Sequence, residues 1–127
     1  MDYTDEENGS GENWETHFKK IIRPLIMDTE KDLRRKAQSA RIKETISIDD
    51  QEGKPVIKGI ALRISVPAKG SGASREHEIR FRSRSEREIS VSYSGIEGLE
   101  EHDIDLSKLN TDIIREELRK FSSKVLE

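Results

Sequence analysis

The sequence predicts an α+β fold in which one helix, four strands and a second helix follow one another (α-β-β-β-β-α). Apolar residues recur at helical spacing from about residue 14, at a spacing of two after about residue 40, and at helical spacing again after about residue 105. Short turn-forming segments join the strands, which indicates a four-stranded antiparallel meander. Each strand has one apolar face, so we expect two layers, with the N- and C-terminal helices packed on one face of the sheet.

The first predicted helix begins after Asn13, whose side chain can accept hydrogen bonds from the free amides of the first turn. Its apolar stripe consists of Trp14, Phe18, Ile21, Ile22, Leu25, Ile26, Leu33 and Ala37. Pro24 lies inside this pattern. Because proline lacks an N–H and clashes with the preceding turn, we expect the helix to be kinked or divided near Arg23.

The four predicted strands lie within residues 41–49, 56–67, 77–85 and 89–94, and alternation gives each strand two faces. The apolar face takes Ile42, Ile46, Ile48, Ile60, Leu62, Ile64, Val66, Ile79, Phe81, Ile89, Val91 and Tyr93. The solvent face takes Lys43, Thr45, Ser47, Arg63, Ser65, Glu78, Arg80, Arg82, Arg84, Ser90, Ser92 and Ser94. A slip of one residue would exchange the faces of a strand, so this pattern also fixes the register.

Residues 94–105, SGIEGLEEHDID, are predicted to form an acidic loop, and residues 105–127 a second amphipathic helix. This helix starts either with Asp105 as its cap or one irregular turn later, at Asn110 and Thr111. Its apolar side consists of Leu106, Leu109, Ile113, Ile114, Leu118, Phe121, Val125 and Leu126.

The composition indicates a thin core. Hydrophobic residues make up 31% of the 127 residues and charged residues 39%. A small domain with a thin core is often stabilised by a partner or by self-association. Residues 1–13 hold five acidic residues and no basic residue, so we expect a disordered acidic tail before a single α+β domain over residues 14–127.

Targeting signals are not evident in the sequence. There is no cysteine, which excludes disulfides and thiolate-bound metals. The N-terminal residues lack the basic and apolar regions of a signal peptide, and no apolar run approaches the length of a membrane span. These observations predict a cytoplasmic protein without contact to membranes.

The sequence contains no pattern typical of catalysis. The three histidines, His17, His77 and His102, lack partners at the spacing of metal ligands. No serine stands in a nucleophile motif, and the glycine-rich segment 69–74 leads into a strand and not into a helix that could hold a phosphate. We therefore expect a protein that is not an enzyme and needs neither a metal nor a cofactor.

Two functional hypotheses follow from the predicted surfaces. The first is a small protein-interaction module, an adaptor, assembly subunit or regulator, that binds a protein partner or a second copy. Its contacts would come from an open strand edge and from Trp14, Phe18 and Met27 near the start of the helical layer.

The second hypothesis is nucleic-acid or phosphate-ligand binding through the solvent face of the sheet, with Lys43, Arg63, Arg80, Arg82 and Arg84 as the binding residues. Arginines and hydroxyls suit phosphate, but the predicted face lacks the aromatic residues on which single-stranded bases stack. The alternative is an ordinary solvated face on which arginines pair with Glu78 across the strands.

Overall fold

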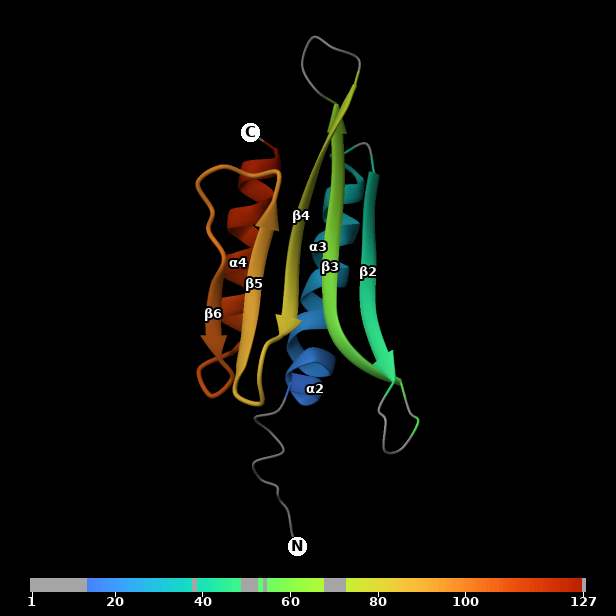
Figure 1. Cartoon of the computed structure of the whole chain (residues 1–127). Coiled ribbons are helices and arrows are strands. Elements are labelled where there is room, and N and C mark those ends of the chain that lie inside the picture. The colour runs from blue at the N-terminus through green and yellow to red at the C-terminus, as the bar shows by residue number, and fades with distance from the viewer. Residues whose placement is uncertain (1–13, 38, 49–52, 54, 68–72, 127) are drawn as a thin grey trace, which may run out of the picture.

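The computed structural model describes residues 14–37, 39–48, 53, 55–67 and 73–126, so the predicted tail at residues 1–13 lies outside the described residues. The α+β class is confirmed. The helices are α2 (Trp14–His17), η1 (Phe18–Ile22), α3 (Arg23–Arg34) and α4 (Thr111–Val125), and the strands are β2 (Ser39–Ile48), β3 (Pro55–Pro67), β4 (Ser74–Ser83), β5 (Glu88–Ser94) and β6 (His102–Asp105) (Figure 1). In this part of the chain, no helix combines the length and the apolar character that crossing a membrane requires.

The sheet has five strands, so the prediction of four is wrong by one. The strands are antiparallel to their neighbours in the order β2-β3-β4-β5-β6. The additional strand, β6, lies in the segment predicted to be an acidic loop and is only four residues long. Ile104 of β6 pairs with Ile89 of β5 and packs against the core. Pairing with β5 therefore stabilises a segment whose acidic residues have little strand propensity of their own.

Pro24 changes the helical geometry at the predicted place. The segments α2, η1 and α3 follow one another directly, and η1 is a π-helical turn of five residues that ends just before Arg23. The backbone N–H of Arg23 donates to the carbonyl of Phe18, five residues earlier. A proline ring clashes with the carbonyl four residues before it, and the wider π-helical turn gives that carbonyl more room.

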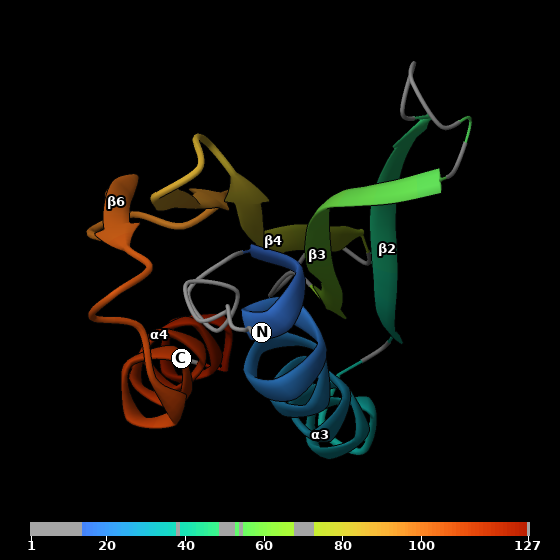
Figure 2. The same cartoon turned by 90° about the horizontal axis from the view of Figure 1, so that it is seen from below.

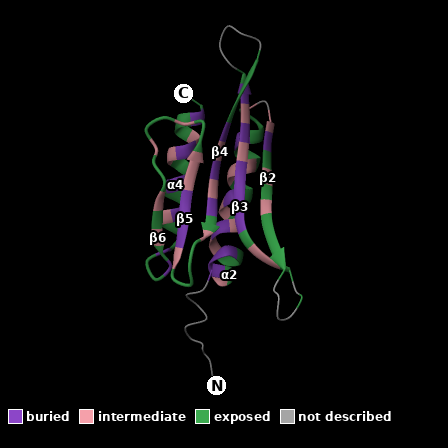
Figure 3. Ribbon diagram, in the orientation of Figure 1, coloured by how far each residue is buried: buried purple, intermediate pink, exposed green. Residues whose placement is uncertain are grey.

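The two long helices lie next to each other on the same side of the curved sheet (Figure 2). Helix α3 contacts β2 and β3, while α4 contacts β4 and η1. Buried residues alternate with more exposed ones along β4 and the second half of β3, whereas residues 59–62 of β3 are buried in succession (Figure 3). The largest fully buried side chains are Phe18, Phe81, Phe121, Ile22, Ile26, Leu33, Ile60, Leu62, Ile64, Ile79, Ile89 and Leu106.

Helix α4 takes the later of its two predicted starts. The side-chain oxygen of Asn110 accepts from the backbone N–H of Ile113 at 2.9 Å and caps the first turn. Asp105 instead accepts from the hydroxyl of Ser107 at 2.7 Å and from its backbone N–H at 2.9 Å. These hydrogen bonds, the hydroxyl bond first, hold the pKa of Asp105 below its ordinary value.

The hairpin of β2 and β3 departs from the predicted faces near its tip. Lys58 is an extra residue in β3, because Thr45 pairs with Gly59 and the next residue, Ile46, pairs with Ile57. Such a bulge bends and twists a strand. Ile46 and Ile48 are 55% and 61% exposed, although the sequence pattern assigns both to the apolar face. The prediction of one buried face along this strand is therefore wrong for these two isoleucines.

Candidate functional site

The basic residues predicted from the sequence lie on the face of the sheet that points away from the helices, which we call the open face. The register aligns them in rows across β2, β3 and β4: Arg41, Arg63 and Glu78; Lys43, Ala61 and Arg80; Thr45, Gly59 and Arg82. Arg84 follows directly after the end of β4. The structure thus brings Lys43, Arg63, Arg80 and Arg82 onto one surface.

Glu78 offsets the charge of two of these arginines. Arg63 donates to Glu78 Oε1 from Nε at 3.1 Å and from Nη2 at 2.9 Å, and Nη2 of Arg80 lies 3.0 Å from Glu78 Oε2. The Glu78 side chain is only 15% exposed, so solvent screens these pairs less than it screens an ordinary surface pair. The cross-strand pairing that the sequence offered as the alternative is confirmed.

The remaining basic residues of the open face differ in their partners. Nε of Arg84 lies 3.4 Å from Oδ2 of Asp103 on β6. Arg41, Lys43 and Arg82 have no acidic partner within the part of the chain that the structure describes. The described residues of this face also include no aromatic side chain, because the aromatic residues of β4 and β5 belong to the core side. The described part of the open face therefore carries positive charge without acidic partners but no exposed ring for base stacking.

The three residues predicted for a protein interface lie in different environments. Trp14 is buried, and its indole Nε1–H donates to the carbonyl of Ile57 at 2.6 Å. Phe18 is fully buried between the Trp14 ring, 5.4 Å away between centroids, and the guanidinium of Arg23 at 4.6 Å. Met27 is 45% exposed. In the folded chain, Met27 is therefore the most accessible of the three, and a role in partner binding stays a prediction.

The outer edge of β2 is one of the open strand edges that the sequence hypothesis of a protein-interaction module includes. Among the described residues, β2 pairs only with β3, so one side of its ten-residue backbone is unpaired. Such an edge can accept a further strand. Its end carries the exposed Ile46 and Ile48. Earlier in the same strand, Arg41 and Lys43 have no acidic partner among the described residues. The opposite edge, β6, is four residues long and acidic, which makes it a poor template.

The length of the hairpin is the sequence signal that could have located this exposed end. Strand β3 has 13 residues and therefore extends over about 43 Å at ordinary strand rise. The helical residues 14–34 extend over only about 32 Å at 1.5 Å per residue. A hairpin longer than the helix that covers it leaves apolar residues at its tip uncovered.

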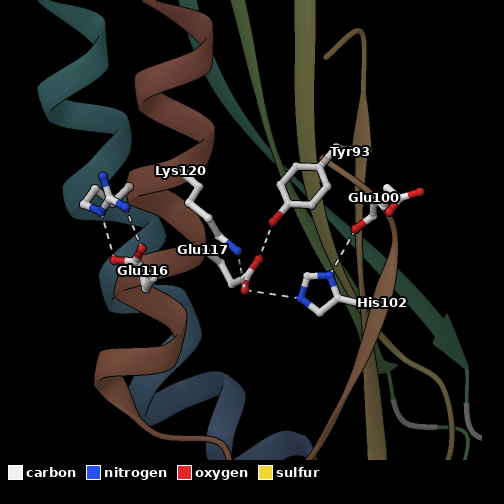
Figure 4. Close-up of polar contacts among 7 residues, drawn as sticks. Tyr93, Glu100, His102, Glu116, Glu117 and Lys120 are labelled. Atoms are coloured by element: carbon white, nitrogen blue, oxygen red, sulfur yellow. Dashed lines mark hydrogen bonds and ion pairs between the residues drawn. The ribbon is translucent and has the colours of Figure 1, made fainter. Parts of the chain in front are cut away.

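A second polar group, the Glu117 cluster, links α4 to the sheet (Figure 4). It consists of Tyr93, His102, Glu117 and Lys120. One oxygen of the buried Glu117 accepts from the Tyr93 hydroxyl, while the other lies 3.2 Å from Nε2 of His102 and 3.3 Å from Nζ of Lys120. Nδ1 of His102 lies 3.0 Å from the carbonyl oxygen of Glu100. The cluster therefore joins β5, β6 and α4 through one carboxylate.

The Glu117 cluster is better suited to holding the helix in place than to proton transfer. Both Glu117 oxygens already contact polar groups of Tyr93, His102 and Lys120, and these contacts join the helix to the sheet. Burial, followed by the hydrogen bond to Glu117, raises the pKa of Tyr93 well above its ordinary value, so its hydroxyl stays protonated. The signal in the sequence was a charged residue, Glu117, beside the apolar residues Ile114, Leu118 and Phe121 of one helix stripe.

The Tyr93→Phe variant should change how stability depends on pH. Above about pH 10, a tyrosine in the unfolded chain loses its proton, whereas folded Tyr93 keeps it. The unfolded state then binds fewer protons, so the free energy of unfolding falls as pH rises. One proton corresponds to at most about 1.4 kcal/mol per pH unit, and partial exposure of Tyr93 makes the slope smaller.

Urea unfolding of the native protein and Tyr93→Phe between pH 7 and pH 11 would measure this effect. Below about pH 10, the free energy of unfolding of the native protein should exceed that of Tyr93→Phe by a constant amount. Above about pH 10, this difference should shrink. A difference that stays constant up to pH 11 would contradict the protonated state assigned to Tyr93.

The chain matches no protein-family model, no curated protein and no solved structure. Within the described residues, no group of His, Asp or Glu side chains is arranged to hold a metal ion. The surfaces described above are therefore the basis for any functional assignment.

Proposed function

We propose that this protein is a protein-interaction module that binds an extended partner segment along the outer edge of β2. The observation that carries the proposal is the exposure of Ile46 and Ile48, at 55% and 61%, on a sheet-edge strand of ten residues. Strand addition gives affinity through backbone hydrogen bonds and specificity through alternate side chains. Burying the two isoleucines would add apolar contact area at the same edge.

The charges beside this edge suggest the chemistry of the partner. Arg41 and Lys43 lie on the open face of β2 without acidic partners in the described residues, while Ile42, Ile46 and Ile48 occupy the alternate positions that belong to its other face. A partner strand with acidic residues on one face and β-branched apolar residues on the other would complement both faces. A second copy fits less well, because two paired β2 strands would place both sets of cations on one sheet face.

Nucleic-acid binding through the open face is the weaker candidate. Its support is the positive charge of Arg41, Lys43 and Arg82, which have no acidic partner among the residues that the structure describes. Against it, Glu78 already engages Arg63 and Arg80, and no aromatic side chain is exposed on the described part of that face. Oligonucleotide binding at about 50 mM salt that disappears at 200 mM and is lost in Arg82→Ser would favour this candidate over strand addition.

A pair of designed peptides tests the strand-addition proposal. A ten-residue peptide that alternates Glu and Val should bind, whereas one that alternates Lys and Val should not, because only the first complements Arg41 and Lys43. Replacing Ile46 and Ile48 together with serine should weaken binding by about thirty-fold, which corresponds to about 1 kcal/mol for each isoleucine. Isothermal titration calorimetry with the full chain measures these affinities.

Met27→Ser together with Leu126→Ser provides a matched control, because these side chains are also large, apolar and exposed, at 45% and 41%. This control should bind the Glu–Val peptide with unchanged affinity. Equal weakening in both double variants, or equal affinity for both peptides, would reject the proposal. Light scattering could instead show that the native chain is a dimer and that the Ile46→Ser and Ile48→Ser double variant is a monomer. That result would assign the edge to a second copy and would reject the proposed partner.

A further inference from the structure

A hollow of about 860 Å³ lies where the start of the helix meets the sheet, and it collects cations from three parts of the chain. Lys58 comes from the bulge in β3, Arg82 from β4 and Arg84 from the turn after it, with Ser83 and Ser85 on either side of Arg84 in the chain. The hollow does not include the exposed isoleucines of β2. It is therefore a surface separate from the proposed strand-binding edge.

Two features of the backbone place these cations. The bulge inserts Lys58 into β3 as a residue without a partner on β2. Beside it, Gly59 stands opposite Arg82, and a Cβ at this position would lie 3.3 Å from Cγ of Arg82 and 3.1 Å from the carbonyl oxygen of Phe81. The absence of a side chain at Gly59 leaves room for Arg82 to lie across the strand. Bulges and strand glycines are often found next to binding sites because they re-aim side chains.

The charge in the hollow is only partly balanced. Lys58 and Arg82 are exposed and form no ion pair within the described residues. Arg84 is 57% exposed and 3.4 Å from Asp103, a pair that solvent screens strongly. Of the acidic residues that line the hollow, Glu15 lies 3.9 Å from Lys19, and Glu86 has no basic partner among the described residues.

We propose that this hollow binds a compact, multiply charged anion of the oligophosphate class. The paired N–H groups of the arginine guanidinium and the hydroxyl groups of serine are well suited to donate hydrogen bonds to phosphate oxygens. The cations converge on one hollow, which suits a compact ligand better than a polymer lying along the sheet. Trp14 lines the hollow but is buried, so its ring is not available for stacking with a base.

Titration of the full chain with inorganic pyrophosphate at about 50 mM salt, followed by ¹H–¹⁵N NMR, tests this proposal. The indole N–H of Trp14 is a built-in reporter, because it lines the hollow and is held by the carbonyl of Ile57 at 2.6 Å. We expect saturable shifts of this signal and of the Arg82 and Arg84 Nε–H signals. Lys58→Gln with Arg82→Gln should weaken binding by at least about ten-fold.

Two controls separate a specific site from general attraction between charges. Lys20→Gln with Lys31→Gln removes two exposed cations from the helices and should leave pyrophosphate binding unchanged. Sulfate at the same concentration should bind more weakly, because it carries less charge. Shifts spread over all basic residues, equal weakening in both double variants, or equal affinity for sulfate would overturn the proposal. Tighter binding of an oligonucleotide than of pyrophosphate would also overturn the compact ligand proposed here.

Discussion

Replacing Phe18 with alanine is expected to lower the free energy of unfolding by about 3–5 kcal/mol. The ring is fully buried next to Trp14 and below the guanidinium of Arg23. Its removal would leave a cavity beneath the π-helical turn, where Pro24 already limits how the backbone can adjust. A thin core has few other contacts to compensate. Urea unfolding monitored by Trp14 fluorescence measures the change.

Met27→Ala is the matched control for Phe18→Ala, since both residues were predicted from the sequence to contact a partner. Because Met27 is 45% exposed, the variant should change stability by no more than about 0.5 kcal/mol. A loss for Phe18→Ala as small as that for Met27→Ala would contradict the position of Phe18 in the core.

Replacing Gly95 with alanine is expected to cost about 2–4 kcal/mol of stability. Gly95 has a φ of +75°, a left-handed conformation that side chains disfavour. A Cβ here would also lie 2.4 Å from the carbonyl oxygen of Glu76, which is backbone and cannot rotate away. The carbonyl of Gly95 lies 2.8 Å from Nδ1 of His77, so a shift of this turn would also disturb the buried His77.

Gly53→Ala separates the two costs of a side chain at Gly95, which are the left-handed backbone conformation and the close approach of the Cβ to Glu76. Gly53 has a similar φ of +67°, but no atom of the described residues lies within 4 Å of the position that its Cβ would take. Its alanine variant should therefore cost only the conformational part, about 1–2 kcal/mol. If chemical denaturation gives the same loss for both variants, the close approach of Gly95 to Glu76 has no energetic effect, and the loop geometry described here would be wrong.

The parts of the fold that depend on local patterns could be predicted from the sequence. The change of apolar spacing located both helices and four strands, because one buried face forces a period of 3.6 or of two. Pro24 located the change in helix geometry, since its covalent structure acts on its own turn. Alternation likewise placed Lys43, Arg63, Arg80 and Arg82 on one face.

The remaining features depend on contacts between distant segments. Strand β6 forms because it pairs with β5 and not because its residues favour strands. The exposure of Ile46 depends on where the helical layer ends relative to the hairpin. The Glu117 cluster joins residues from β5, β6 and α4, with Tyr93 and Glu117 24 positions apart. The spacing of apolar residues along the sequence contains no information about contacts between segments that are so far apart.

Amide hydrogen exchange of the full chain, with and without the Glu–Val peptide, tests the proposed interaction most directly. Half of the N–H groups of an edge strand point outward, so an added strand should slow exchange at alternate residues of β2. Exchange in β6, the other edge of the sheet, should not change. Strand addition at β2 predicts this alternating protection. Protection on β6 or on the helices, or bound peptide without any slowing in β2, would contradict it.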